Sequence, residues 1–168
     1  MIVLQTPTGS RLFGLDNEDS DYDQMIVYSD NRRAEHHKIG DQDITATGLS
    51  DFMWKCNRGS PQYLDAMFSQ QATVDVIADL RKQYRTTYAA VLPTYTRLIK
   101  HLWFTGVEED DRKKRRHAVR LYRNLKDIDL YGRYNPSMSF SRALYTTASA
   151  SDAGVEATQK FMSDILNS

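Results

Sequence analysis

Residues 9 to 14 read Gly-Ser-Arg-Leu-Phe-Gly, and residues 20 to 23 read Ser-Asp-Tyr-Asp. The first stretch follows a short β-prone run, Ile2-Val3-Leu4, and its glycines predict a turn that leaves this first strand. The second stretch opens a run of alternating residues that predicts another strand. Asp21 and Asp23 are two positions apart, so their side chains project from the same face of that strand. The sequence therefore predicts paired carboxylates beside a glycine-containing turn.

This combination of residues suits the transfer of phosphorylated groups. Such chemistry uses two divalent cations roughly 3.5 to 4 Å apart, and Mg²⁺ prefers a few carboxylates together with phosphate oxygens. Asp21 and Asp23 have the spacing that such ligands need. Gly9 and Ser10 offer backbone N–H groups and a hydroxyl to a triphosphate, and Arg11 adds a cation. We therefore expect metal-dependent phosphoryl or nucleotidyl transfer.

The polar stretch 29 to 42 predicts an exposed connection, and a further strand is expected at 43 to 47. Ser50 is a candidate N-cap for a helix over Phe52 to Asn57. Ser60-Pro61 then predicts a second helix, with serine as the N-cap and proline at the first helical position.

From Thr73 onward the sequence pattern is helical. The predicted segments run from Thr73 to Leu92, from Pro93, where the helix is expected to break, to Phe104, and from Glu108 to Tyr131, where Gly132 ends the helix. The last of these buries a stripe made of Ala118, Leu121, Tyr122, Leu125 and Ile128, and places Lys113, Arg116, Arg120 and Arg123 nearer the rim. Residues 133 to 150 are expected to be irregular. Ser151 is expected to cap a final helix whose apolar face is Val155, Phe161, Met162, Ile165 and Leu166.

These elements predict an α+β fold in which a small mixed sheet carries the carboxylates and helices pack on one face. Residues 1 to 72 form the predicted catalytic core, and residues 73 to 168 form a C-terminal helical portion that completes the nucleotide cleft. The two portions are expected to be one compact unit, because no linker or repeat separates them.

Composition restricts the class of protein further. The chain has 168 residues and a single cysteine, so it cannot form an intramolecular disulfide. No window approaches the length of a membrane span, and the N-terminal apolar run is too short for a signal sequence. We therefore expect a soluble protein in the cytoplasm. Lys plus Arg and Asp plus Glu both number 22, so the net charge alone gives no argument for nucleic acid.

Simpler interpretations compete with the functional one. The acidic run from Asp19 could be a calcium loop, but the sixth and twelfth positions of such a loop need glycine and glutamate, and here they are Gln24 and Asp30. The basic run 112 to 116 is as compatible with a solvated helix face as with a phosphate-binding surface. The remaining histidines, His36, His37 and His101, have no partners in the sequence pattern and are interpreted as ordinary polar residues.

The combined motif resembles the DNA polymerase beta superfamily, in which Gly-Ser is followed after about ten residues by Asp-x-Asp. It is similar in particular to the minimal nucleotidyltransferases of the RNA repair pathway polymerase beta family, whose members read Gly-Ser-Arg-aromatic-Gly and then Ser-Asp-Tyr-Asp. Further similar stretches are Asp43-Ile44-Thr45, Gly59-Ser60-Pro61, Asp65 where glutamate is usual, and a basic helix with His117 and Arg120.

The resemblance implies a set of roles. Asp21 and Asp23 would bind two Mg²⁺ (or Mn²⁺) ions, and Asp43 would complete the site, although Asp41 has the same parity on its strand. The implied nucleotide-binding residues are Gly9, Ser10, Arg11, His117 and Arg120. The implied reaction moves a nucleoside monophosphate from an NTP to an RNA 3′ end or to a protein hydroxyl, with release of pyrophosphate. The rival interpretation is a catalytically silent module of the same fold that binds nucleotides or nucleic acid.

Overall fold

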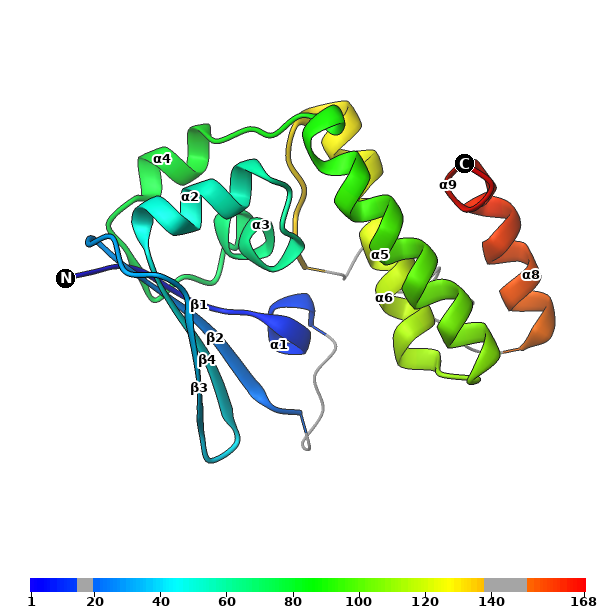
Figure 1. The fold of residues 1–168 in the computed structure, drawn as a ribbon, viewed down its shortest axis with the longest axis horizontal. Helices are drawn as coiled ribbons and strands as arrows, with labels where there is room; N and C mark the ends of the chain where they lie inside the picture. Colours follow the sequence, from blue (N-terminus) through cyan, green and yellow to red (C-terminus); the bar gives the residue numbers. More distant parts are fainter. Residues whose placement is uncertain (15–19, 138–150) are drawn as a thin grey trace.

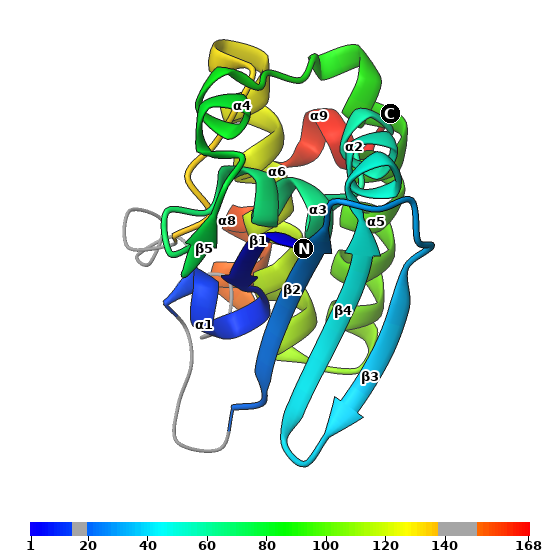
Figure 2. The ribbon, with the colours of Figure 1, turned by 90° about the vertical axis from the view of Figure 1, so that its left-hand side faces the viewer.

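The computed structural model describes residues 1–14, 20–137 and 151–168. It has a five-stranded mixed sheet with helices packed on one face, which confirms the predicted α+β fold (Figures 1 and 2). The strands are β1 (Ile2–Pro7), β2 (Tyr22–Tyr28), β3 (Glu35–Ile39), β4 (Gln42–Gly48) and β5 (Val74–Asp75), and their order in the sheet is β3-β4-β2-β1-β5.

The helices account for most of the remaining described residues. They are α1 (Gly9–Phe13), α2 (Leu49–Asn57), α3 (Pro61–Phe68), α4 (Ala78–Gln83), α5 (Tyr88–Glu108), α6 (Arg112–Tyr131), α8 (Asp152–Phe161) and α9 (Ser163–Leu166). None of these helices is both long enough and apolar enough to span a bilayer.

Strands β2 and β4 run parallel, and all other neighbouring strands are antiparallel. Side chains alternate between the two faces, so Met25 and Val27 point into the core while Ile26 is only half-buried. Asp23 lies on the same face as Met25, at the end of the strand where the core gives way to solvent. The register pairs Asp23 directly with Asp43 of β4.

Strand β3 was not predicted, because residues 29 to 42 were interpreted as a connection. Residues Glu35–Ile39 pair with β4 in an antiparallel hairpin. All five are exposed, so this edge strand lacks the apolar alternation that identifies half-buried strands. The turn itself is Gly40-Asp41, where Gly40 has a φ of 60°, as two-residue hairpin loops require.

Two predicted helix starts were wrong. Helix α2 begins at Leu49 with Gly48 as its N-cap, so Ser50 lies inside the helix. Helix α6 begins at Arg112 because the Asp111 side chain accepts a hydrogen bond from the Lys114 N–H. The predicted Ser60-Pro61 start of α3 and the predicted end of α6 before Gly132 are both confirmed.

The predicted helix from Thr73 to Leu92 is also wrong. In its place β5 pairs with β1, which adds residues beyond position 72 to the sheet, and the short helix α4 follows. Helix α5 begins only at Tyr88 and runs without a break through Pro93. Pro93 has no N–H to donate to the Ala89 carbonyl. Both residues are exposed, so water can hydrogen-bond to that carbonyl instead.

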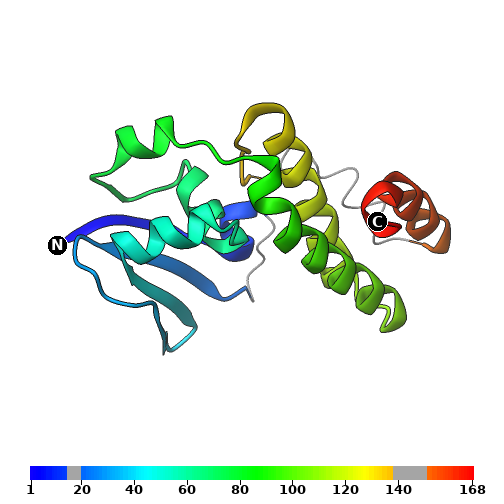
Figure 3. The ribbon, with the colours of Figure 1, turned by 45° about the horizontal axis from the view of Figure 1, so that its top comes forward.

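Helices α5 and α6 form an antiparallel hairpin whose buried stripes face each other (Figure 3). The α6 stripe predicted from the sequence is confirmed, and it packs against Val91, Tyr95, Ile99 and Trp103 of α5. The C-terminal helices lie against this hairpin, where the Tyr122 hydroxyl donates to the Phe161 carbonyl. Ser151 caps α8 as expected, but Phe161 is 44% exposed. Most of the region predicted to be irregular, residues 138 to 150, lies outside the described residues.

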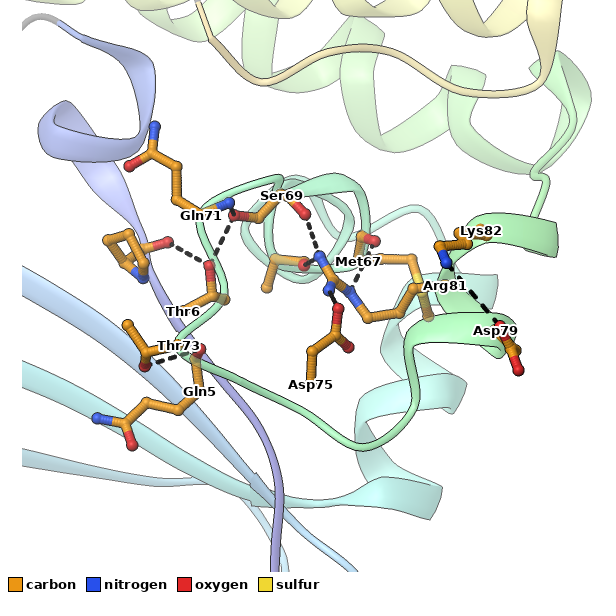
Figure 4. A network of polar contacts seen from close by, with 12 residues as sticks. Gln5, Thr6, Met67, Ser69, Gln71, Thr73, Asp75, Asp79, Arg81 and Lys82 are labelled. Carbon is orange, nitrogen blue, oxygen red and sulfur yellow. Dashed lines mark hydrogen bonds and ion pairs between the residues drawn. The ribbon is translucent and has the colours of Figure 1, made fainter.

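A buried arginine joins α3, α4 and β5 (Figure 4). Arg81 is 5% exposed and donates hydrogen bonds to the carbonyls of Ala66, Met67 and Ser69, and it pairs with the Asp75 carboxylate. These carbonyls belong to the last turn of α3 and its cap, where helical partners are missing. Arg81 therefore supplies hydrogen bonds to the terminal carbonyls of α3, the helix that forms the inner wall of the cavity described below.

Candidate active site

The turn after β1 forms the short helix α1, which ends at Gly14 in the left-handed conformation. The Thr8 N–H donates to the Asp23 carbonyl at 2.8 Å, and this bond fixes the start of the turn against β2. Gly9 has a φ of 66°, and a Cβ at this position would overlap the Asp23 carboxylate. Only glycine allows this close approach, so the predicted contact between the turn and one of the two carboxylates is present.

Gly9→Ala should therefore lower the free energy of unfolding by about 1 to 3 kcal/mol, since a side chain is strained at this φ and displaces Asp23. Gly40→Ala is the matched control, because Gly40 has a φ of 60° but nothing within 4 Å of its added Cβ. Urea denaturation should show the larger loss for Gly9→Ala. Equal losses of unfolding free energy in the two variants would contradict the close contact between Gly9 and the Asp23 carboxylate.

The carboxylates gather at the end of the parallel pair β2 and β4. Asp23 is half-buried, Asp43 is its cross-strand neighbour, and Asp21 lies exposed just before β2. Burial raises the pKa of Asp23, and the negative charges of Asp43 and Asp21 raise it further, while Lys113 and Lys38 act in the opposite direction. Asp23 is therefore close enough to both other acids to be affected by their negative charge.

A cavity of ≈ 520 Å³ lies between this end of the sheet, α3 and the α5–α6 hairpin. It is lined by Thr8, Gly9, Phe13, Asp23, His36, His37, Asp43, Ile44, Thr45, Ser60, Pro61, Gln62, Asp65, Leu98, Leu102, His117, Arg120 and Leu121. Five predicted site residues are thus brought together, namely Gly9, Asp23, Asp43, His117 and Arg120. Asp43 lines the cavity and Asp41 does not, because Asp41 belongs to the hairpin turn.

Three predicted site residues lie outside the lining: Ser10, Arg11 and Asp21. The Arg11 side chain turns back over β2, where its Nη2 donates to the Ser20 carbonyl at 3.3 Å and its guanidinium lies 5.1 Å from the centre of the Tyr22 ring. Arg11 therefore braces the turn. Asp21 contributes through its charge, since it helps to raise the pKa of Asp23.

His117 contacts the turn from the opposite side of the cavity, with its ring 6.3 Å from that of Phe13 in an edge-on arrangement. Burial lowers the pKa of His117 to about 4, and the positive charges of Arg120 and Lys113 lower it further. His117 is therefore neutral at neutral pH and can donate or accept a hydrogen bond inside the cavity.

This lowered pKa predicts a pH dependence of stability. Below pH 6.5 the unfolded chain binds a proton at His117, while the folded chain does so only near pH 4, so the free energy of unfolding falls as the pH drops through this window. The contribution reaches about 3 kcal/mol at most. His117→Gln should lack it, so urea denaturation from pH 7 to pH 4.5 should show a shallower loss in the variant. Parallel curves would contradict the lowered pKa.

Arg120 is buried, and its predicted position near the rim was wrong. It is 7% exposed, because α6 packs against α5 on one side and against α1 and α3 on the other, which buries a wider arc than one stripe. Its Nη1 lies 3.2 and 3.1 Å from the two Asp65 oxygens, and its guanidinium lies 3.9 Å from the centre of the Phe13 ring. Arg120 is therefore part of the cavity wall.

Three further residues of this wall were not among the predicted site residues: His36, Thr45 and Gln62. Thr45 Oγ1 lies 3.0 Å from His36 Nδ1 and accepts from Gln62 Nε2 at 3.3 Å, and all three residues line the cavity. Thr45 could have been found, because it is two positions after Asp43 on the same face. His36 could not, because its position depends on the unpredicted hairpin.

Within residues 1–14, 20–137 and 151–168, no three His, Cys, Asp or Glu side chains are gathered closely enough to hold a metal ion by themselves. Comparison with known proteins adds the family. The sequence model of the RNA repair pathway DNA polymerase beta family matches residues 1–162. A comparison with curated proteins finds no match. The match covers nearly the whole chain, and the chain belongs to the RNA repair pathway DNA polymerase beta family.

Proposed function

We propose that this protein is a two-metal nucleotidyltransferase that moves a nucleoside monophosphate from an NTP to a hydroxyl acceptor and releases pyrophosphate. One observation supports the proposal above the others. The Asp23 carboxylate lies against Gly9 of the Gly-Ser turn and beside Asp43, inside a cavity large enough for a nucleotide. In this proposal Gly9, which binds phosphate, shares one cavity with the metal ligands Asp23 and Asp43.

The donor set fits divalent cations. Asp23 is half-buried among like charges that raise its pKa, and such a cluster is costly unless a cation compensates it. Mg²⁺ needs only one or two protein carboxylates, because substrate phosphates supply further oxygens. Asp21, Asp23 and Asp43 would hold the ions. When bound, the two ions supply an electrophilic clamp on the reacting phosphate and favour ionisation of the attacking hydroxyl.

The remaining side chains have positioning roles in this proposal. The N–H groups and hydroxyl of Gly9 and Ser10 bind the triphosphate, and Arg11 braces their turn. His117 and Arg120 contact the nucleotide from α6. The acceptor oxygen bonds to the α-phosphorus as the bond from that phosphorus to the pyrophosphate oxygen breaks, and a carboxylate oxygen of Asp43 accepts the hydroxyl proton.

The acceptor that we propose is an RNA 3′ end, because the family is described by its place in RNA repair. A protein hydroxyl is the second acceptor to test. Lys38 and Lys113 lie near the carboxylates and offer positive charge to a polynucleotide backbone.

The test is to incubate the protein with each of the four α-labelled NTPs, Mg²⁺ or Mn²⁺, and an RNA that ends either in a 3′ hydroxyl or in a 3′ phosphate. We expect label on the RNA with the free hydroxyl and none on the blocked RNA, since the blocked end has no nucleophile. Candidate proteins replace the RNA in a parallel set of reactions.

The outcomes separate the proposals. Label on protein but not on RNA would replace the proposed acceptor. Nucleotide binding without transfer to either acceptor would favour a catalytically silent module of the same fold. If no nucleotide binds, measured by calorimetry with Mg²⁺ present, the proposed function is lost.

A further inference from the structure

Asp65 is an acid placed where the sequence of α3 is otherwise apolar. It lies within the wholly buried run Tyr63–Phe68 and is itself 3% exposed. Burial raises the pKa of Asp65, while the charge of Arg120 and hydrogen bonds from Tyr134 and Arg120 act in the opposite direction. A buried carboxylate is costly unless it is paired and hydrogen-bonded, so the position of Asp65 depends on these partners.

The partners all come from the α5–α6 hairpin and the segment that follows it. Tyr134, just after α6, donates its hydroxyl to Asp65 Oδ1 at 2.6 Å, and the hydroxyl of Tyr95 in α5 lies 3.4 Å from that of Tyr134. Both tyrosines are buried. The Tyr134 ring packs edge-on against Phe68 at 5.0 Å, which holds the hydroxyl in line with the carboxylate. A chain of hydrogen bonds therefore runs from α5 to the Asp65 carboxylate.

The same carboxylate fixes Arg120 on the other side. Both Asp65 oxygens contact Arg120 Nη1, and the guanidinium plane lies over the Phe13 ring of α1. Because a guanidinium is planar and rigid, fixing one nitrogen and one face fixes the direction of the whole group. Phe13, Asp65 and Arg120 all line the cavity, whereas Tyr95 and Tyr134 do not.

A purely structural role explains this arrangement poorly. Buried ion pairs contribute little net stability compared with well-packed apolar residues. Their use is geometric, and here the oriented cation belongs to the wall of a cavity that also contains Gly9 of the phosphate-binding turn. Planar donors with a fixed direction are suited to phosphate groups.

We propose that Asp65 and Tyr134 are positioning residues that hold the Arg120 guanidinium against Phe13 in the direction that binds the phosphates of the nucleotide. The inference rests on the proposed function, because it takes the cavity to be the nucleotide site. Tyr134 acts on the nucleotide only through Asp65 and Arg120, since it does not itself reach the cavity.

The test compares two buried tyrosines, one inside this network and one outside it. Tyr134→Phe removes the hydroxyl that holds Asp65. Tyr122→Phe removes the hydroxyl of another buried tyrosine, which donates to Phe161 and Asp164, away from the cavity. The probe is a non-hydrolysable ATP analogue with Mg²⁺, and its Kd is measured by calorimetry. We expect Tyr134→Phe to raise this Kd by about 10-fold, in keeping with the loss of one hydrogen bond to a charged group, and Tyr122→Phe to leave it within about 2-fold.

A second comparison shows whether the effect passes through Arg120. In an Arg120→Lys background, Tyr134→Phe should produce no further rise in Kd, because the oriented guanidinium is already gone. Asp65→Glu retains a carboxylate and should bind the analogue more tightly than Asp65→Asn. Melting temperatures of all variants are measured alongside, and Tyr134→Phe, the mildest change, decides the question if Asp65→Asn does not fold.

The failures are distinguishable. If the wild type binds the analogue and Tyr134→Phe binds it equally well, the network is only structural and the inference is overturned while the proposed function stands. An equal rise in Kd for Tyr122→Phe, or an undiminished effect of Tyr134→Phe in the Arg120→Lys background, would overturn it as well. If the wild type binds no analogue, the proposed function fails and this inference fails with it.

Discussion

Asp23→Asn should reduce nucleotidyl transfer by about 10³-fold or more while leaving the fold at least as stable as that of the wild type. The loss is expected because Asp23 is the only one of the two DxD aspartates that lines the cavity, where it lies against Gly9 and beside Asp43. The stability should not fall, because burial and two neighbouring acids raise the pKa of Asp23, and an amide removes that repulsion. Transfer is measured with labelled NTP, and stability by thermal melting in metal-free buffer.

Asp41→Asn is the matched control for this variant. Asp41 has the same parity as Asp43, but it lies in the Gly40-Asp41 turn and outside the cavity lining. It should retain wild-type transfer, whereas Asp43→Asn should lose most of it. Near-normal transfer by Asp23→Asn would remove the chemical basis of the proposed function. A clear fall in its melting temperature without metal would instead make Asp23 a structural residue.

The end of the sheet that carries Asp23 and Asp43 could be predicted because its signals are local. The period of two predicted that Asp23 projects beside the turn, and a glycine before a polar residue predicts the tight turn. The same period also placed Asp21 on that face, but Asp21 lies before β2 and outside the cavity lining. The same period of two predicted the face of the next strand from which Asp43 projects. The direct pairing of Asp23 with Asp43 could not be predicted, because parallel register is set by how the intervening chain folds.

That intervening chain contains β3, the strand that the sequence pattern did not predict. An exposed edge strand buries no side chain, so selection for solubility leaves it polar, like a loop. His36 and His37 were interpreted as ordinary polar residues for this reason, although both line the cavity. The Gly40-Asp41 pair was the one available signal, because a Gly-Asp dipeptide is typical of a two-residue hairpin loop.

Helical periodicity identified which α6 residues face α5 but not how far the buried arc extends. Arg120 adjoins the predicted stripe, and its burial requires a counter-charge from another element. The sequence does contain that counter-charge, since an aspartate amid the apolar residues Tyr63 to Phe68 must be paired if the helix is buried. The pairing of Asp65 with Arg120 could not be predicted from the sequence. It depends on the tertiary contact between α3 and α6, which no local sequence rule predicts.

The same dependence on tertiary contacts makes Arg81 a residue whose loss should destabilise the fold strongly. Arg81→Met keeps the aliphatic stem and should lower the free energy of unfolding by about 3 kcal/mol or more, because removing the buried guanidinium leaves several acceptors without a donor. The stranded groups are the Asp75 carboxylate and the carbonyls at the end of α3 (Figure 4). Urea denaturation measures the loss directly.

Arg85→Met provides the comparison, since Arg85 is also an arginine that donates to nearby carbonyls, at Lys82 and Tyr84, but it is exposed. Water can replace those bonds, so this variant should stay within about 0.5 kcal/mol of the wild type. We expect Arg81→Met to weaken nucleotide binding as well, because Asp65 lies on α3. The loss of binding should follow the fraction of the protein that is unfolded. Losses of similar size in the two variants would show that the carbonyls at the end of α3 find other donors and that α4 is not needed to hold the cavity wall.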